Sequence, residues 1–129
     1  MLIGEVAQAS GTPTKTLRYY EEAGLLPAPE RTAGGYRNYA PDTLARLDFI
    51  RRSRAAGLTL AQVREVLDIR DTGVAPCQHV HDLLDTRLAD LDRQLVDLQA
   101  LRDTVSDLRD SAATIDPATC DPAAVCRYI

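Results

Sequence analysis

The feature that most constrains this sequence is an apolar pattern that extends from Pro76 to about Ala113. Apolar residues recur there at steps of three and four, the spacing of a seam along one face of a supercoiled helix. These residues are Val80, Leu84, Leu88, Leu91, Leu95, Leu98, Leu101, Val105, Leu108 and Ala112. Such a helix is on the order of 50 Å long, which exceeds the width of a small domain. We therefore predict a dimerisation helix whose seam packs against a second chain; a long helix lying on its own domain is the alternative.

Composition leaves room for one small folded domain and an extended element. The chain has 129 residues, of which 45% are hydrophobic and 26% charged. No apolar run approaches the roughly 18 residues needed to cross a bilayer. The first residues have neither the basic flank nor the apolar core of a signal peptide. We therefore expect a cytoplasmic protein that does not associate with a membrane.

The net charge of −4 conceals a difference between the two halves of the chain. Residues 1–58 contain 8 Lys and Arg against 6 Asp and Glu, whereas residues 59–129 contain 7 against 13. The first part is therefore net positive by 2 and the second net negative by 6. Only the N-terminal part is suited to face the phosphates of a nucleic acid.

Two short helices joined by a tight turn are predicted at the N-terminus. Residues 3–10 have a helical pattern that ends at Gly11, and a second helix, capped by Thr12 and opened by Pro13, ends at Gly24. This arrangement is typical of a helix-turn-helix, in which the second helix enters the DNA major groove.

The predicted second helix has a basic and aromatic face. Lys15, Arg18 and Tyr19 lie three to four residues apart and share this face, while Leu17 and Tyr20 can point inward. We expect the three outward residues to contact DNA. An ordinary surface helix with two basic residues and a tyrosine is the alternative.

A small β-hairpin is predicted next, because Gly34 and Gly35 stand between two short β-compatible stretches. The hairpin contains Arg31, Tyr36 and Arg37. Beside a recognition helix, such a basic hairpin is expected to act as a wing that grips the phosphate backbone. An ordinary surface hairpin is the alternative.

Two further helices are predicted before the long one. Pro41 opens a third helix that ends at Gly57, and Thr59 with Gln62 forms a capping box for a fourth that runs to about Arg70. In the third helix we expect apolar residues on the inner side and arginines elsewhere. The inner residues are Leu44, Leu47 and Ile50, and the arginines are Arg46, Arg51, Arg52 and Arg54.

Three cysteines flank the predicted long helix: Cys77 at its start, and Cys120 and Cys126 after its end. An odd number of cysteines in a cytosolic chain argues against a disulfide framework and favours metal or redox chemistry. Thiolates form a soft, anionic site that binds ions such as Hg, Cd, Pb or Zn far better than Mg or Ca.

The order and spacing of these motifs resemble the MerR family of transcriptional regulators, in particular its heavy-metal-responsive branch. The segments that carry the resemblance are 15–21 (Lys-Thr-Leu-Arg-Tyr-Tyr-Glu), 24–26 (Gly-Leu-Leu), 34–39 (Gly-Gly-Tyr-Arg-Asn-Tyr), 47–51 (Leu-Asp-Phe-Ile-Arg) and 57–60 (Gly-Leu-Thr-Leu). The resemblance implies a winged helix-turn-helix domain, a dimer formed through an antiparallel coiled coil, and an effector site in the C-terminal tail. It covers essentially the whole chain.

The resemblance also implies roles for individual residues. Arg18 and Tyr19 would read or brace the recognition-helix contact, Tyr36 and Arg37 would be wing contacts, and Arg54 would contact a phosphate. The homodimer would bind a pseudo-palindromic promoter together with RNA polymerase holoenzyme. Transcription would be switched on when the effector changes the distortion of the promoter.

The same resemblance implies a metal site shared between chains. In an antiparallel dimer, Cys77 of one chain would join Cys120 and Cys126 of the partner subunit. Family members that sense divalent ions have a cysteine at this helix start, whereas copper-type sensors tend to have a serine. We therefore expect a soft divalent effector: Hg, Cd, Pb or Zn. The four clustered cysteines of the iron–sulfur members are missing here.

Two histidines are candidates for an additional ligand. His81 lies four residues after Cys77 on the same helical face and could complete a tetrahedral Zn or Cd site, whereas three sulfurs alone would suit Hg or Pb. His79 is a further candidate. A histidine that is merely solvated is the alternative for both.

The sequence therefore predicts a mainly α protein: a winged helix-turn-helix DNA-binding domain over 1–70, a linker over 71–76, a coiled-coil helix over 77–113 and a metal-binding loop over 114–129. A thiol redox sensor, in which Cys120 and Cys126 form a disulfide, is the alternative on the same fold. A coiled-coil adaptor that does not bind DNA is another. No nucleophile–base pair, phosphate-binding loop or pair of catalytic carboxylates stands out, so we do not expect an enzyme.

Overall fold

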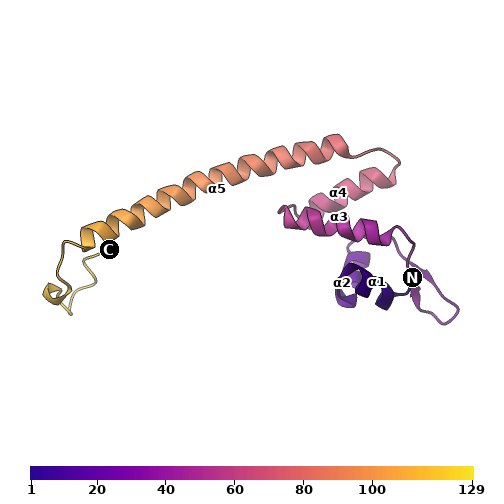
Figure 1. The fold of residues 1–129 in the computed structure, drawn as a ribbon, viewed down its shortest axis with the longest axis horizontal. Coiled ribbons are helices and arrows are strands. Elements are labelled where there is room, and N and C mark those ends of the chain that lie inside the picture. Colours follow the sequence, from indigo (N-terminus) through magenta and orange to yellow (C-terminus); the bar gives the residue numbers. More distant parts are fainter. The chain divides into compact units, whose positions relative to one another are not determined.

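The computed structural model describes residues 1–129 and is mainly helical, as the sequence predicts (Figure 1). The elements in chain order are α1 (Ile3–Ser10), α2 (Thr14–Glu22), β1 (Glu30–Arg31), β2 (Arg37–Asn38), α3 (Thr43–Ala55), α4 (Leu60–Asp71), α5 (Cys77–Ala112) and the 3-10 helix η1 (Pro117–Thr119). Two compact units result, residues 1–87 and residues 88–129. No helix is both long enough and apolar enough to cross a membrane.

The predicted helix-turn-helix forms from α1 and α2. Gly11 ends α1 with a positive φ of 68°, the left-handed conformation that glycine adopts without a Cβ clash. The cap predicted for the second helix is wrong in detail, because Pro13 holds the N-cap position and no side chain caps the helix. The Thr12 amide instead donates to the Ser10 hydroxyl at 3.2 Å, which tightens the turn between the two helices.

The predicted hairpin is the antiparallel pair β1 and β2, in which Glu30 faces Asn38. Gly35 has a φ of 80° in the connecting turn. The N-terminus packs against this hairpin, because the Met1 ammonium donates to the Asn38 side chain at 2.9 Å and Leu2 forms a bridge with Asn38. The hairpin is therefore attached to the start of the chain.

A hydrophobic core unites α1–α4 within residues 1–87. The predicted capping box is confirmed: the Gln62 amide donates to the Thr59 hydroxyl at 3.1 Å, and the Thr59 amide donates to the Gln62 side chain at 2.9 Å. The buried core residues are Val6, Leu17, Leu25, Leu26, Tyr39, Leu47, Ile50, Leu58, Val63 and Leu67. Leu83 of α5 packs against them, so the first turns of α5 belong to this unit.

Arg46 is buried, which contradicts the expectation that all four arginines of the third helix lie away from the inner side. The residue has only 5% of its surface exposed. Nε donates to the Leu25 carbonyl at 2.6 Å, and the two terminal nitrogens donate to the two carboxylate oxygens of Asp71 at 2.8 and 3.0 Å. Arg46 thereby connects α3 to the segment after α2 and to the end of α4. On the surface, water would hydrogen-bond to the guanidinium. In this buried position, the Leu25 carbonyl and the Asp71 carboxylate take the place of water.

The long helix α5 has 36 residues and none of them is buried. At about 1.5 Å per residue, a helix of this length extends roughly 54 Å. Its leucine seam is exposed to solvent in the single chain; Leu88, Leu95 and Leu98, for example, have 59%, 64% and 63% of their surface exposed. After the helix, the tail is ordered locally by Asp116, whose side chain accepts from the Ala118 amide at 3.0 Å at the start of η1.

We expect Arg46→Met to lower the free energy of unfolding by about 2–3 kcal/mol, because it leaves the buried Leu25 carbonyl without a donor and removes both bonds to Asp71. Urea unfolding followed by circular dichroism at fixed protein concentration measures the change. Arg51→Met is the matched control on the same helix. Arg51 is exposed and pairs only with Asp48, so its loss should cost less than about 0.5 kcal/mol. Equal effects of the two substitutions would contradict this role of Arg46.

The contribution of Asp71 should depend on pH. The hydrogen bonds from Arg46 lower the pKa of the Asp71 carboxyl below its ordinary value, against a smaller opposing effect of desolvation. A lowered pKa in the folded state stabilises the protein above the unfolded-state pKa of about 3.9, and this contribution disappears as the pH falls through the folded-state pKa. The stability difference between wild type and Asp71→Asn should therefore be full at neutral pH and shrink below about pH 4.

Candidate DNA-binding and metal-binding sites

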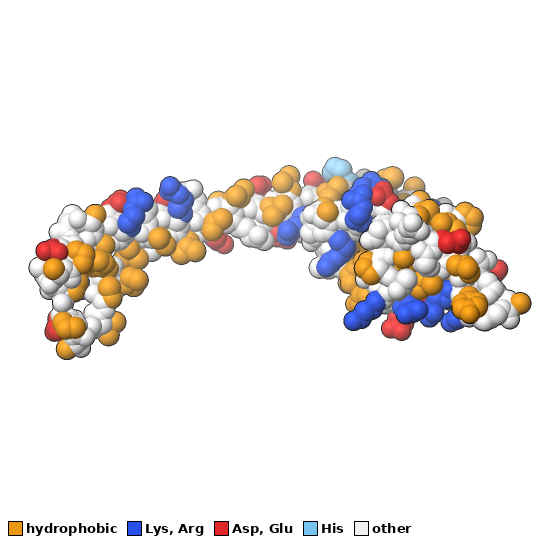
Figure 2. Space-filling view, turned by 60° about the horizontal axis from the view of Figure 1, so that its bottom comes forward, with side chains coloured by type: hydrophobic (Ala, Val, Ile, Leu, Met, Phe, Trp, Pro, Cys, Tyr) orange, Lys and Arg blue, Asp and Glu red, His pale blue; other side chains and the backbone are white.

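The outward face of α2 is basic and has no partner within the chain. Lys15, Arg18 and Tyr19 are exposed, and neither of the two cationic side chains forms an ion pair or a hydrogen bond. On the opposite side, Leu17 is completely buried and Tyr20 packs against the core. Figure 2 shows Lys and Arg side chains gathered on one face of the N-terminal unit. The structure thus leaves these two cations free to bind an anionic partner.

The hairpin presents its own exposed side chains next to the turn. Tyr36 is 70% exposed, and its ring lies over Gly34, where a Cβ would meet the ring carbons at 3.1 Å. Arg31 is exposed, and its terminal nitrogen donates to the Gly35 carbonyl at 2.9 Å. The Arg31 bond therefore stabilises the turn, while both Tyr36 and Arg31 remain exposed to solvent.

Glu21, which the sequence did not single out for a role of its own, connects the hairpin to α2. Its carboxylate oxygen Oε2 accepts from Arg37 Nε at 3.0 Å and from the Tyr39 hydroxyl at 3.4 Å. Burial and, after it, the charge of Glu21 raise the pKa of Tyr39 above its ordinary value. Arg37 is thus held by α2, and this contact fixes the hairpin relative to the helix that precedes it. The sequence gives little indication of this ion pair, because a carboxylate 16 residues from an arginine can pair with many other cations or with water.

Arg54 lies in the last turn of α3 and is exposed. Its terminal nitrogen donates to the Leu58 carbonyl at 2.9 Å. A guanidinium has five N–H groups, so this bond orients the side chain and still leaves donors for a phosphate. Lys15, Arg18, Arg31, Arg37 and Arg54 all belong to the unit formed by residues 1–87.

All three cysteines are free thiols. Cys77 is the first residue of α5 and is exposed, Cys126 is exposed, and Cys120 is partly buried in the tail. Cys77 lies at the N-terminus of α5, where the unpaired backbone N–H groups and the helix dipole can interact with a bound anion or ligand. The chain therefore offers accessible sulfur ligands in both of its units.

Tyr128 contacts both cysteines of the tail, a role that the sequence did not reveal. Its backbone N–H donates to Cys126 Sγ at 3.4 Å. Its hydroxyl donates to the Ile115 carbonyl at 3.0 Å, closing residues 115–128 into a loop. Desolvation and then the neighbouring Cys120 thiol raise the pKa of this phenol. Tyr128 thus supplies one hydrogen-bond donor to the Cys126 sulfur and places its phenol near Cys120, and such neighbours can orient metal ligands.

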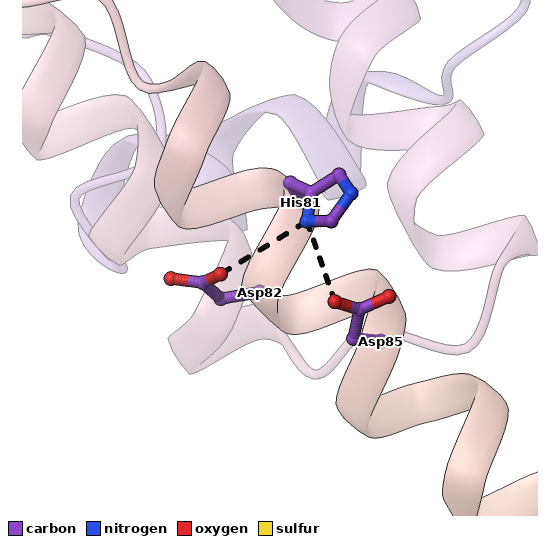
Figure 3. Close-up of side chains that lie close together, drawn as sticks. All are labelled: His81, Asp82 and Asp85. Carbon is purple, nitrogen blue, oxygen red and sulfur yellow. Dashed lines mark ion pairs between the residues drawn. The ribbon is translucent and has the colours of Figure 1, made fainter.

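The two histidines of the first α5 turns face carboxylates. His81 Nδ1 lies 3.3 Å from Asp85 Oδ2 and 4.0 Å from Asp82 Oδ1, on an exposed face of the helix (Figure 3). His79 Nε2 lies 3.5 Å from Glu65 Oε2 of α4 and is shielded from solvent. One nitrogen of each histidine therefore lies near a carboxylate. The role of His81 as a fourth ligand of a metal ion bound by Cys77 stays a prediction.

The two short helices, the exposed basic face of α2 and the attached hairpin define a winged helix-turn-helix protein. The sequence matches the family model "MerR HTH family regulatory protein" over residues 1–69 and the model "MerR, DNA binding" over residues 44–108. The chain belongs to the MerR family of DNA-binding transcriptional regulators, and it is not an enzyme.

Named relatives cover most of the chain. The mercuric resistance operon regulatory protein of Bacillus cereus is 38% identical over 108 residues, which are 84% of this chain and 82% of that protein. A probable heavy metal-dependent transcriptional regulator of Haemophilus influenzae is 36% identical over 120 residues, 93% of this chain and 94% of that protein. Among solved structures, the transcription regulator PbrR691 of Ralstonia metallidurans CH34 in complex with lead(II) matches with a TM-score of 0.79 at 38% identity, covering 93% of this chain and 94% of that one.

We expect Arg18→Ala to weaken binding to a duplex that the wild-type protein has selected from a random library. The loss should be about tenfold or more if Arg18 reaches a base edge. Fluorescence anisotropy over a series of salt concentrations measures it. Arg93→Ala removes the same charge from α5, where Arg93 pairs within the helix with Asp90, and should leave the affinity within about twofold. Unchanged binding by Arg18→Ala would contradict the assignment.

We expect Tyr128→Phe to weaken the binding of a thiophilic ion by about tenfold, because it removes the hydroxyl that closes the cysteine loop and lies beside Cys120. Thiolate-to-metal absorption during a lead(II) titration, with a competing chelator, measures the affinity. Tyr36→Phe makes the same chemical change on the hairpin and should have no effect on it. Equal affinities for wild type and Tyr128→Phe would show that the loop needs no support from this phenol.

Proposed function

We propose that this regulator responds to a soft divalent metal ion, Hg, Cd, Pb or Zn, bound by Cys77 of one chain together with Cys120 and Cys126 of the partner subunit. The protein would bind a pseudo-palindromic promoter as a homodimer, and metal binding would switch transcription on by changing the distortion of the DNA. The observation that carries the proposal is the placement of three free thiols, one at the first residue of α5 and two in the tail that follows it.

The exposed seam of α5 supports a homodimer. Leucines with about half or more of their surface in water are costly to leave uncovered, at roughly 25 cal/mol per Å² of apolar surface. A second copy of the same helix presents the same three- and four-residue spacing and can cover the seam over its whole length. Two-fold symmetry also matches two DNA-binding units to two half-sites of a promoter.

An antiparallel arrangement supports a metal site shared between chains. The two ends of a 36-residue helix are about 54 Å apart, so one helix cannot bring a ligand at its first residue to a loop beyond its last. In an antiparallel pair, the first residue of one helix lies beside the end of the other. Cys77 would then meet the tail cysteines of the other chain, and three sulfurs would surround one ion.

The donor set supports a soft ion. Three thiolates favour Hg, Cd, Pb and Zn over hard cations, because sulfur is a polarisable ligand. The relatives named above include a regulator of a mercuric resistance operon and a regulator crystallised with lead(II). The residues around the tail sulfurs fit such an ion, since Tyr128 places a backbone N–H on Cys126 and a phenol beside Cys120. Free thiols also require a reducing compartment, and we propose the cytoplasm.

Activation through DNA distortion would follow from the simultaneous binding of the two DNA-binding units to one promoter. DNA contacts from Lys15, Arg18, Arg31, Arg37 and Arg54 would fix each unit on its half-site. If metal binding changes the angle between the units, the promoter between them must bend or untwist, and this changes its fit to RNA polymerase holoenzyme. Metal occupancy is thus converted into transcription without any contact between the metal and the DNA.

A thiol redox sensor is the second candidate, because Arg127 next to Cys126 donates to the hydroxyl of Thr119 next to Cys120 at 2.8 Å and so links the segments that contain the two thiols. Oxidation would form one sulfur–sulfur bond and transfer two electrons and two protons to an oxidant such as a peroxide. The native mass distinguishes the two functions before any metal is added. A metal adduct supports the metal sensor, and a chain two hydrogens lighter than the reduced form supports the redox sensor.

A mixture of two inactive variants tests the shared site. Cys77→Ser and the double variant Cys120→Ser, Cys126→Ser each lack a three-sulfur site in a dimer with themselves. After subunit exchange, each mixed dimer has one intact site if the ligands come from both chains. A one-to-one mixture should recover about one quarter of the wild-type sites, because half of the dimers are mixed and each has one site of two.

Lead(II) titration of the mixture, followed by thiolate-to-metal absorption, measures this recovery. Cu(I) added as a competitor checks the preference for a divalent ion. If the three cysteines of a single chain formed the site, the mixture would bind no more than the separate variants. Promoter binding by metal-free Cys77→Ser should match that of wild type, since Cys77 is not among the DNA-contact residues.

A further inference from the structure

Arg87 joins α5 to the end of α3, and neither the sequence motifs nor the proposed function account for it. Arg87 lies one turn after Leu83, which packs against the core of the DNA-binding unit. The Arg87 side chain is half-buried, and its Nε donates to the Ala56 carbonyl at 3.3 Å, across 31 positions of sequence. It is the last residue of the compact unit formed by residues 1–87.

The turn at the end of α3, to which Arg87 donates, has a regular hydrogen-bond pattern. The Gly57 amide donates to the Arg54 carbonyl at 2.9 Å, and the Leu58 amide donates to the Ser53 carbonyl at 3.1 Å. This is the Schellman pattern, and it leaves the Ala56 carbonyl without a backbone donor. The carbonyl end of a helix bears partial negative charge, so a guanidinium is well placed there.

The contact also depends on a glycine. Gly57 has a φ of +86°, and a Cβ at this position would lie 2.6 Å from one terminal nitrogen of Arg87 and 2.7 Å from Nε. The guanidinium therefore lies directly on the backbone of the turn. A side chain on residue 57 would displace it, in addition to straining the left-handed backbone.

The same turn holds Arg54, for which we propose a phosphate contact. The terminal nitrogen of Arg54 donates to the Leu58 carbonyl, two residues from the carbonyl that Arg87 binds. A movement of α5 that carried Arg87 with it would therefore shift the turn that orients Arg54. Leu83 provides only apolar contact, whereas Arg87 makes a directional bond.

We propose that Arg87 is a positioning residue that transmits the state of α5 to the DNA-binding unit, so that movement of the long helix is converted into movement of the DNA contacts near the end of α3. The proposal concerns the protein–DNA complex itself. Its metal-dependent part rests on the metal-sensing function proposed above.

The test compares Arg87→Ala with wild type on a promoter that contains 2-aminopurine at its centre, where loss of base stacking raises the fluorescence. We expect Arg87→Ala to alter the fluorescence of the metal-free complex and to reduce the change caused by lead(II) by about fivefold or more. Affinity for the duplex and affinity for lead(II) should both stay within about twofold of wild type, because Arg87 is proposed to touch neither ligand.

Arg93→Ala is the matched control, since it removes the same charge from the same helix outside the compact unit that contains Arg87. Arg87→Lys is a second variant for the case that Arg87→Ala is poorly folded. It keeps the charge and most of the stem but loses the planar group that lies on Gly57. Circular dichroism confirms the helical content of each variant.

The proposal would be overturned if the Arg87 variants gave the same fluorescence as wild type both without metal and with lead(II). It would also be overturned if Arg93→Ala reduced the lead(II)-induced fluorescence change as much as Arg87→Ala does. A large loss of DNA affinity with an unchanged response to lead(II) would also overturn it, because Arg87 would then be part of the DNA contact itself. If wild type does not bind lead(II) or another thiophilic ion, the metal-sensing function fails, and the metal-free comparison still decides the role of Arg87.

Discussion

The apolar seam of α5 is the constraint on which the arrangement of this protein depends. Most of its leucines are half exposed or more, and no residue of the helix is buried in the single chain. Water-exposed leucines at coiled-coil spacing strongly favour association with another apolar helix. A second copy of α5 would satisfy this requirement and would also duplicate the DNA-binding unit. Dimerisation, promoter symmetry and the shared cysteine site that we propose all follow from covering this one surface.

Arginine side chains hold together the part of the molecule that binds DNA. Arg46 connects α3 to the Leu25 carbonyl and to Asp71, and Arg37 connects the hairpin to Glu21 of α2. Arg87 connects α5 to the end of α3. Each of these guanidiniums donates to an element that is distant in sequence. Lys15 and Arg18 on α2, by contrast, have no partner within the chain. Arg46 and Arg87 therefore bond within the unit and Lys15 and Arg18 face outward, while Arg37 keeps N–H donors that Glu21 does not use for the DNA contact that we propose.

The tail shows how a short segment can orient thiols without a hydrophobic core. Tyr128 uses its hydroxyl to close the loop on Ile115 and its backbone N–H to reach Cys126. The Asp116 cap starts η1, which ends just before Cys120. Local hydrogen bonds thus order the loop that contains the two thiols, and in the site that we propose the third sulfur comes from Cys77 of the partner subunit. A site completed only when the ion binds would suit the sensor function that we propose.

The sequence by itself determined the elements of this protein, since each depends on local patterning. Glycines at 11 and 35, the Thr59 capping box, the leucine spacing of α5 and the order of the motifs were sufficient to predict the helix-turn-helix, the hairpin, the long helix and the family. Only the tertiary structure decided which polar side chains face inward. Arg46 was expected outside and is buried, while Glu21, Arg87 and Tyr128 were not recognised as connecting residues. Their partners lie 13 to 31 positions away in the chain, and hydrogen bonds over such separations follow from packing geometry rather than from periodicity.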